Sequence, residues 1–159
     1  VPLFTGFMYA AIGSYMMRAW SLFDFRFSGH PPLWQVSALA AAIYVNFFAH
    51  HWLPDMRYVL FLACALVFGR SWIYYRVHHS WRCMPMLVAA LLAAVFIWLA
   101  ENIGTYTGTW LYPGQKTWHL VSFSKMGSWY LLLFLSFVLV TLVHRPQGRE
   151  RISRACVRP

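Results

Sequence analysis

The chain has 159 residues and a net charge of +9; 60% of the residues are hydrophobic and only 11% are charged. A soluble domain carries about 25% charged residues, so a soluble globular domain, a disordered chain and a disulfide-stapled secreted domain are excluded, and the composition predicts an integral membrane protein. Nucleic-acid binding is excluded as well, because the 13 lysines and arginines are scattered between apolar runs and form no basic face.

Five apolar runs predict five membrane-spanning helices, since about 20 mostly apolar residues cross the hydrocarbon as a helix. The runs lie near residues 1–17, 33–53, 58–75, 83–104 and 126–144. Arg70 interrupts the third run, and its long side chain is expected to reach the lipid headgroups. The predicted fold is an all-α, polytopic membrane helix bundle over residues 1–144, followed by a basic tail over residues 145–159.

The positions of lysine and arginine predict the orientation of this bundle. Five arginines lie in the tail, and the connections 18–32 and 76–82 hold Arg18, Arg26, Arg76 and Arg82. The remaining connections hold only Arg57, Lys116 and Lys125. Because basic loops stay in the cytoplasm, the first residue is expected outside and the tail inside.

Glu101, in the run Ala-Glu-Asn-Ile-Gly at residues 100–104, is the only acid near the interior of a predicted span. A carboxylate at membrane depth is costly and therefore pairs with a cation, a proton or a functional group. One hypothesis makes Glu101 a general acid. The other makes it a hydrated residue near the outer surface, or the ion-pair partner of Arg57 or Lys125.

A second polar group closes the run 33–53, where Asn46 and His50, and likewise His51 and Asp55, stand four residues apart on one helix face. Counted from the inner ends of their spans, His50 and Glu101 both lie about 26 Å up the helix. This similar depth predicts that they face one cavity near the outer surface as an acid–base pair. The supporting residues would be Asn46, Asp55, Asn102 and His119, with the segment 105–119 as a cover.

His50 and His51 are also the candidate cofactor ligands. Two histidines with a carboxylate can hold a metal ion, and a membrane histidine among aromatic rings can bind the magnesium of a chlorophyll. The histidine boxes of diiron membrane oxygenases are missing, and His78 and His79 fall on the other predicted side of the membrane. A diiron desaturase is therefore excluded, and the sequence leaves the metal and the cofactor, if any, undefined.

Seven segments are spread over the chain before the tail: VPLF (1–4), FMYA (7–10), FDFR (23–26), YVNFF (44–48), AENIG (100–104), WLYP (110–113) and SFVLVTLVH (136–144). Together they resemble the YoaT-like bacterial integral membrane proteins, a domain of unknown function. The resemblance implies the fold and a location in the bacterial cytoplasmic membrane, but no reaction. Members of that family extend further upstream, so we expect further residues before Val1.

Two classes of function follow from these observations. The lack of a soluble domain and of a complete catalytic motif favours a structural or auxiliary subunit of a larger membrane assembly, pigment-containing assemblies included, with membrane lipids as the other partners. The alternative is a membrane enzyme that acts on a lipid or an isoprenoid, with Glu101 and His50 as the acid–base pair. A complete transporter is disfavoured because the five predicted helices show no internal repeat.

Overall fold

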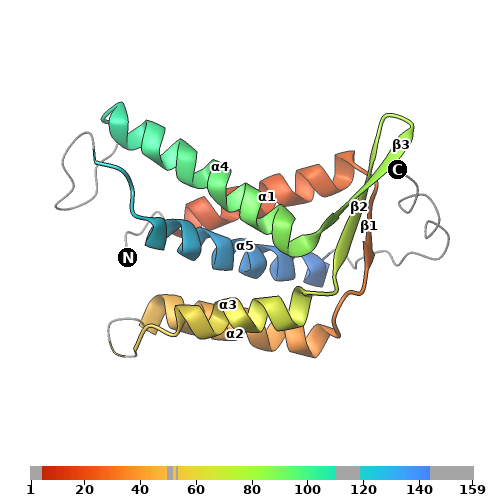
Figure 1. Cartoon of the computed structure of the whole chain (residues 1–159), viewed down its shortest axis with the longest axis horizontal. Coiled ribbons are helices and arrows are strands. Elements are labelled where there is room, and N and C mark those ends of the chain that lie inside the picture. Colours follow the sequence, from red (N-terminus) through yellow and green to blue (C-terminus); the bar gives the residue numbers. More distant parts are fainter. Residues whose placement is uncertain (1–4, 50–51, 53, 110–118, 144–159) are drawn as a thin grey trace.

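The computed structural model describes residues 5–49, 52, 54–109 and 119–143. Along these residues the elements are α1 (Thr5–Leu22), β1 (Phe25–Ser28), α2 (Leu33–Ala49), α3 (Arg57–Phe68), β2 (Trp72–Val77), β3 (Ser80–Pro85), α4 (Met86–Tyr106) and α5 (Phe123–Val143). The helices form an elongated bundle, and the three strands lie together at one end of it (Figure 1). We call this the sheet end. The far end holds the last turns of α2 and α4 and the first turns of α3 and α5.

Prolines stand where three of the helices begin. The carbonyl of Pro32 accepts a hydrogen bond from the amide of Gln35 at 3.0 Å ahead of α2, and Pro54 comes shortly before α3. Pro85 is the residue that caps the start of α4. The first turn of a helix leaves its amides without helical partners, so the missing amide hydrogen of proline costs nothing there.

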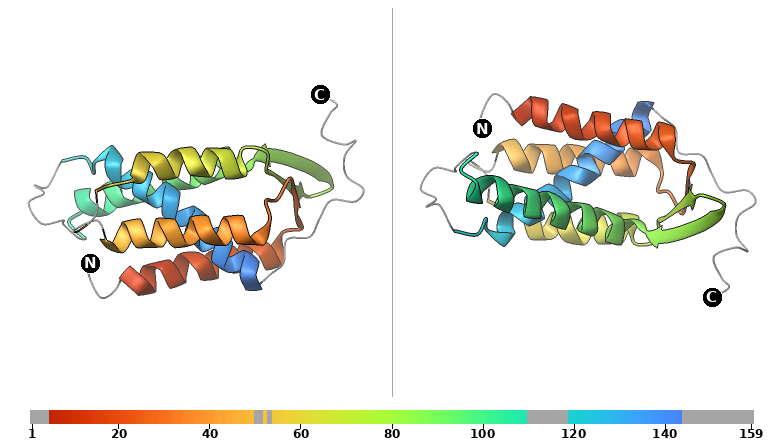
Figure 2. Two further views of the ribbon diagram at one scale, coloured as in Figure 1. Left: turned by 90° about the horizontal axis from the view of Figure 1, so that it is seen from below. Right: turned by 90° about the horizontal axis from the view of Figure 1, so that it is seen from above.

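α5 is the central helix of the bundle. It contacts α1, α2, α3 and α4, and it crosses them diagonally (Figure 2). Phe134 and Val138 of α5 are almost completely buried, together with Ile43 of α2 and Phe68 of α3. The rings of Phe68 and Phe134 stack with their centroids 4.8 Å apart. A helix that is apolar on every side is expected to be surrounded in this way.

α4 is equally apolar but far less covered. Leu91, Leu92, Phe96, Leu99 and Ile103 are all exposed, with 71% of Phe96 and 65% of Ile103 accessible. By length and composition, α4 and α5 are the two described helices that could cross a membrane, whereas α2 and α3 are apolar but shorter. So large an exposed apolar surface on one helix is typical of a site of interaction with a membrane or another protein.

The expectation of an all-α fold is wrong in one respect, because the described residues include a three-stranded antiparallel sheet in the order β1-β2-β3. β1 pairs with β2 from Phe25↔Tyr75 to Ser28↔Trp72. β2 pairs with β3 from Trp72↔Pro85 to Val77↔Ser80. The side chains of residues 72–77 are mostly aromatic or β-branched and suit a strand as well as a membrane helix, so hydropathy alone could not distinguish the two.

The sheet also changes where the third helix ends. α3 stops at Phe68 rather than near residue 75. Arg70 therefore lies exposed in the turn between α3 and β2, and not inside a membrane span. Its charge is at the bundle end, where no snorkelling side chain is needed.

A junction at Gly29 fixes the sheet to the bundle. Gly29 has φ +67°, and the carbonyl oxygen of Gly29 accepts a hydrogen bond from the hydroxyl of Ser71 at 2.9 Å. The carbonyl of Ser71 in turn accepts the amide of Met86, the first residue of α4, at 3.0 Å. These contacts tie β1, the start of β2 and the start of α4 together.

Candidate functional site

The polar residues proposed for the shared site belong, wherever the structure describes them, to segments that meet at the far end of the bundle (Figure 1). They come from the last turn of α2, the approach to α3, the last turns of α4 and the approach to α5. These residues are Asn46, Asp55, Glu101, Asn102 and His119. His119 is exposed, whereas Glu101 is buried.

The two histidines proposed as the acid–base partner and the cofactor ligands, His50 and His51, lie outside the described residues. The same holds for residues 110–118 of the expected cover. The pairing of His50 with Glu101 therefore stays a prediction. α2 ends at Ala49, at the same end of the bundle as the last turns of α4.

Glu101 is only 6% exposed, and its neighbour along one helix face, Thr105, is 3% exposed. The carboxylate of Glu101 interacts electrostatically with Lys125 in the first turn of α5. Burying a carboxylate costs several kcal/mol unless an opposite charge and hydrogen bonds compensate. Lys125 is one of the two cations named as ion-pair partners from the sequence.

Arg57 instead joins α3 to α5 through a different set of partners. Its guanidinium lies 2.9 Å from a carboxylate oxygen of Asp55. It also donates to the carbonyl oxygen of Ser124 at 2.9 Å and to the hydroxyl of Ser124. The other oxygen of Asp55 accepts the backbone amide of Arg57, the first residue of α3, at 3.0 Å.

Asn102 and Trp98 together hold the chain that leads into α5. The side-chain oxygen of Asn102 accepts the amide of Val121 at 2.8 Å, and the indole of Trp98 donates to the carbonyl of Val121 at 2.8 Å. The side-chain amide of Asn102 donates to the carbonyl of Trp98 at 2.7 Å. Trp98 also stacks on Phe123, the first residue of α5, at 5.0 Å. The polar groups of both side chains thus form hydrogen bonds with backbone groups.

This arrangement predicts that Asn102→Ala lowers the stability of the protein by about 1–3 kcal/mol, because it leaves the amide of Val121, a residue that is 3% exposed, without its acceptor. Thermal unfolding in detergent, followed by tryptophan fluorescence, measures the loss. Asn46→Ala is the matched control: Asn46 also accepts a backbone amide, that of Met56, at an exposed site where water can replace it. Equal losses for the two variants would contradict this role of Asn102.

A small cavity of about 150 Å³ lies beside the ion pair of Asp55 and Arg57. Its polar lining comes from Asn46, Asp55, Arg57 and Ser128. Sites for small organic ligands measure roughly 300–1,000 Å³. The cavity is therefore large enough for a few water molecules and too small for a lipid or isoprenoid substrate.

Within the described residues, no three histidine, cysteine, aspartate or glutamate side chains come close enough to hold a metal ion together. His78 and His79 stand side by side with their ring centroids 4.4 Å apart. They form the turn between β2 and β3 at the sheet end, so the length of the bundle separates them from Glu101 (Figure 1).

The sequence interpretation missed Trp98 and Ser124. Trp98 stands four residues before Asn102, and that spacing on one helix face is the signal that could have linked them. Nothing in the local sequence indicates that Ser124 accepts from Arg57, because the two residues are far apart along the chain.

Comparisons with known proteins show which family the sequence of this chain matches. The family model described as "Protein of unknown function (DUF817)" matches residues 1–137. The protein described as "Uncharacterized protein YoaT" of Bacillus subtilis (strain 168) is 43% identical over 141 residues, which are 88% of this chain and 53% of that protein. The chain thus spans about half the length of this curated relative. No solved structure matches it.

Proposed function

We propose a role from the geometry of this chain, which belongs to the DUF817 family of proteins of unknown function. Membership of that family assigns no reaction. We propose that the chain is a multi-pass protein of the bacterial cytoplasmic membrane and acts there as a structural or auxiliary subunit of a membrane assembly. In this proposal the sheet end and the basic tail face the cytoplasm, and the far end faces outward.

The observation that carries the proposal is the distribution of charge along the bundle. The described sheet end has five arginines, Arg18, Arg26, Arg70, Arg76 and Arg82, against Asp24 alone. The far end balances Asp55 and Glu101 with Arg57 and Lys125. Between the ends, the helical segments 5–17, 33–49, 58–68, 86–100 and 126–143 carry no charged residue. Such a neutral band with one basic edge matches the positive-inside pattern of membrane proteins.

The exposed surface of α4 supports the same proposal. Its leucines, Phe96 and Ile103 face outward on a helix long enough to cross the hydrocarbon. Water would oppose so large an apolar surface, whereas lipid tails accommodate it. α1, α2, α3 and α5 enclose the core, and α4 extends the apolar surface that the bilayer would cover.

The contacts at the far end support an auxiliary role over a catalytic one. Asn102, Asp55 and Arg57 each hold backbone segments in place, and Lys125 lies by Glu101. A general acid needs a reacting group and a cavity large enough to admit it. The cavity lined by Asp55 and Arg57 is too small for a lipid, and Glu101 is not among the residues that line it, so the enzyme alternative has weaker support.

Alkaline carbonate extraction of cell membranes tests the membrane location. We expect the full chain to remain in the membrane pellet and to enter the soluble fraction only with detergent. Release by carbonate alone would contradict integral insertion.

For the auxiliary role, we expect the detergent-extracted protein to migrate in a complex with a second polypeptide at fixed stoichiometry. A monomer without such a partner would contradict the auxiliary role.

A further inference from the structure

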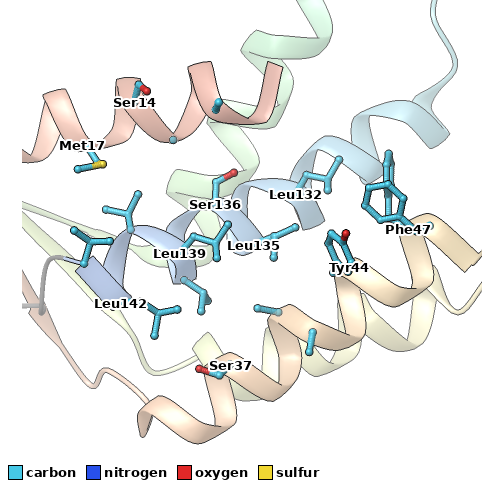
Figure 3. A pocket seen from close by; sticks show the side chains of 18 residues that line it. Ser14, Met17, Ser37, Tyr44, Phe47, Leu132, Leu135, Ser136, Leu139 and Leu142 are labelled. Carbon is cyan, nitrogen blue, oxygen red and sulfur yellow. The ribbon is translucent and has the colours of Figure 1, made fainter. Parts of the chain in front are cut away.

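An apolar groove of about 810 Å³ runs along one side of the bundle, between α1 and α2, with α5 as its floor (Figure 3). Ser14 and Met17 line it from α1, Ser37 and Tyr44 from α2, and Ser136 and Leu139 from α5. The groove is separate from the polar contacts at the far end. None of the residues that hold Glu101, Asn102 or Arg57 lines it.

Small side chains keep the walls of the groove apart. Gly13 lies on the α1 wall, and a Cβ atom added there would meet no heavy atom within 4 Å. Ala40 and Ala41 lie on the α2 wall. Among the described residues, the space is therefore open up to the backbone of α1 at Gly13.

The length of the groove corresponds to one leaflet of a bilayer. Its lining runs from Ser37 to Phe48 on α2 and from Leu132 to Val143 on α5. At 1.5 Å per residue, each of these stretches is about 16 Å long. Half of a hydrocarbon core of about 30 Å is about 15 Å. On α2 the lining ends at Phe48, in the last turn of that helix, so a lipid tail that enters from the sheet end would run along the groove toward the far end.

The volume of the groove, about 810 Å³, suits a lipid tail. Ligand cavities for small molecules cover roughly 300–1,000 Å³, and the groove falls within this range.

The charged residues near the sheet end of the groove indicate which lipid headgroup would bind there. Met17 lines the groove at the sheet end, and the next residue, Arg18, is exposed. No described acid other than Asp24 lies at this end, and Asp24 forms an ion pair with Arg26 at 3.1 Å. The guanidinium of Arg18 thus has its charge available for a phosphate at the mouth of the groove.

We propose that this groove holds an acyl chain of an anionic phospholipid from the cytoplasmic leaflet, with the lipid phosphate bound by Arg18. The proposal rests on the membrane location proposed above. The lipid is a retained ligand at one site, distinct from the mobile lipids that surround the exposed face of α4.

Photolabelling of the full chain tests the proposal. The delipidated protein in detergent is incubated with a phosphatidylglycerol that carries a diazirine on one acyl chain, and the labelled peptides are mapped. Labels are expected on α1, α2 and α5 at groove residues, and competition by unlabelled phosphatidylglycerol should be about tenfold stronger than by phosphatidylcholine. Arg18→Gln should remove this preference, and Arg18→Lys should retain most of it.

Two neighbouring alanines provide the matched pair for the groove itself. Ala41→Phe places a ring in the groove, whereas Ala42 is exposed next to it and does not line the groove. Labelling should fall at least about fivefold in Ala41→Phe and stay unchanged in Ala42→Phe. Equal labelling of the two variants, labels centred on α4, or cross-links to another polypeptide would each overturn the proposal. If carbonate extraction still leaves these variants in the membrane, a labelling result that overturns the proposal contradicts the lipid site and not the membrane location.

Discussion

Gly29→Ala is expected to lower the stability of the protein by about 3 kcal/mol or more and to detach the sheet from the bundle. Two costs add at this position. Gly29 has φ +67°, which costs any other residue about 1–2 kcal/mol. A Cβ atom there would also collide with the carbonyl oxygen of Arg70, and a backbone atom cannot move aside as a side chain can. Thermal unfolding of the purified protein in detergent measures the loss.

Gly108→Ala separates these two costs. Gly108 has φ +70°, but an added Cβ atom there would meet no heavy atom within 4 Å. This variant should therefore lose no more than the about 1–2 kcal/mol of the backbone conformation. If Gly29→Ala and Gly108→Ala lose the same stability, the contact between β1 and the α3–β2 turn is not what holds the sheet in place.

The second large effect is expected for Glu101→Lys, which should cost about 3–5 kcal/mol because it places a second positive charge beside Lys125 in a buried site. Glu101→Gln keeps the size of the side chain and most of its hydrogen bonding, and its loss should be clearly smaller. Unfolding in detergent compares the two variants. Combining Glu101→Lys with Lys125→Glu should recover part of the loss, and no recovery would contradict the interaction between these residues.

The same glutamine variant decides between the two functions. If the chain is an auxiliary subunit, Glu101→Gln should form the same membrane complex as the parent, in the same amount and with the same partner, and complement a deletion strain fully. Loss of complementation in a variant that folds and assembles normally would favour acid–base chemistry at Glu101. The auxiliary role would then be wrong as the whole account of function.

Hydropathy predicted most of the helical part of the fold. The apolar runs at 33–53, 83–104 and 126–144 each contain most of one observed helix. The basic connections 18–32 and 76–82 were expected on one side, and their strands lie in one sheet at one end of the bundle. The side of the membrane on which this end lies stays a prediction.

The sheet could not be predicted from the same pattern. Residues 72–77 are apolar enough to continue a membrane helix, and the choice of a strand depends on pairing with residues 25–28, far away in the sequence. Such pairing is a tertiary effect that overrides local preference. The close approach of Gly29 to the carbonyl of Arg70 is likewise visible only in three dimensions.

The candidate site was predicted by location more than by partners. Helical depth was counted for His50 and Glu101; Glu101 lies at the far end, as do the supporting residues Asn46 and Asn102, whereas His50 lies outside the described residues. Ion pairing at Glu101 was one of two hypotheses, and the sequence did not favour Lys125 over Arg57. In the structure Lys125 interacts with Glu101, and Arg57 contacts Asp55 and Ser124. Helical spacing gives the face of a residue, but not which of two cations is nearer.

Cysteine accessibility across the membrane tests the central claim most directly. In a background without Cys64, Cys83 and Cys156, single cysteines replace Ser80, exposed in the β2–β3 hairpin, or Thr109, exposed after α4. In intact protoplasts, a membrane-impermeant maleimide should label Thr109→Cys, and it should label Ser80→Cys only after lysis. Labelling of both positions in intact protoplasts would contradict a bundle that spans the membrane, and the reverse pattern would contradict the cytoplasmic position of the sheet.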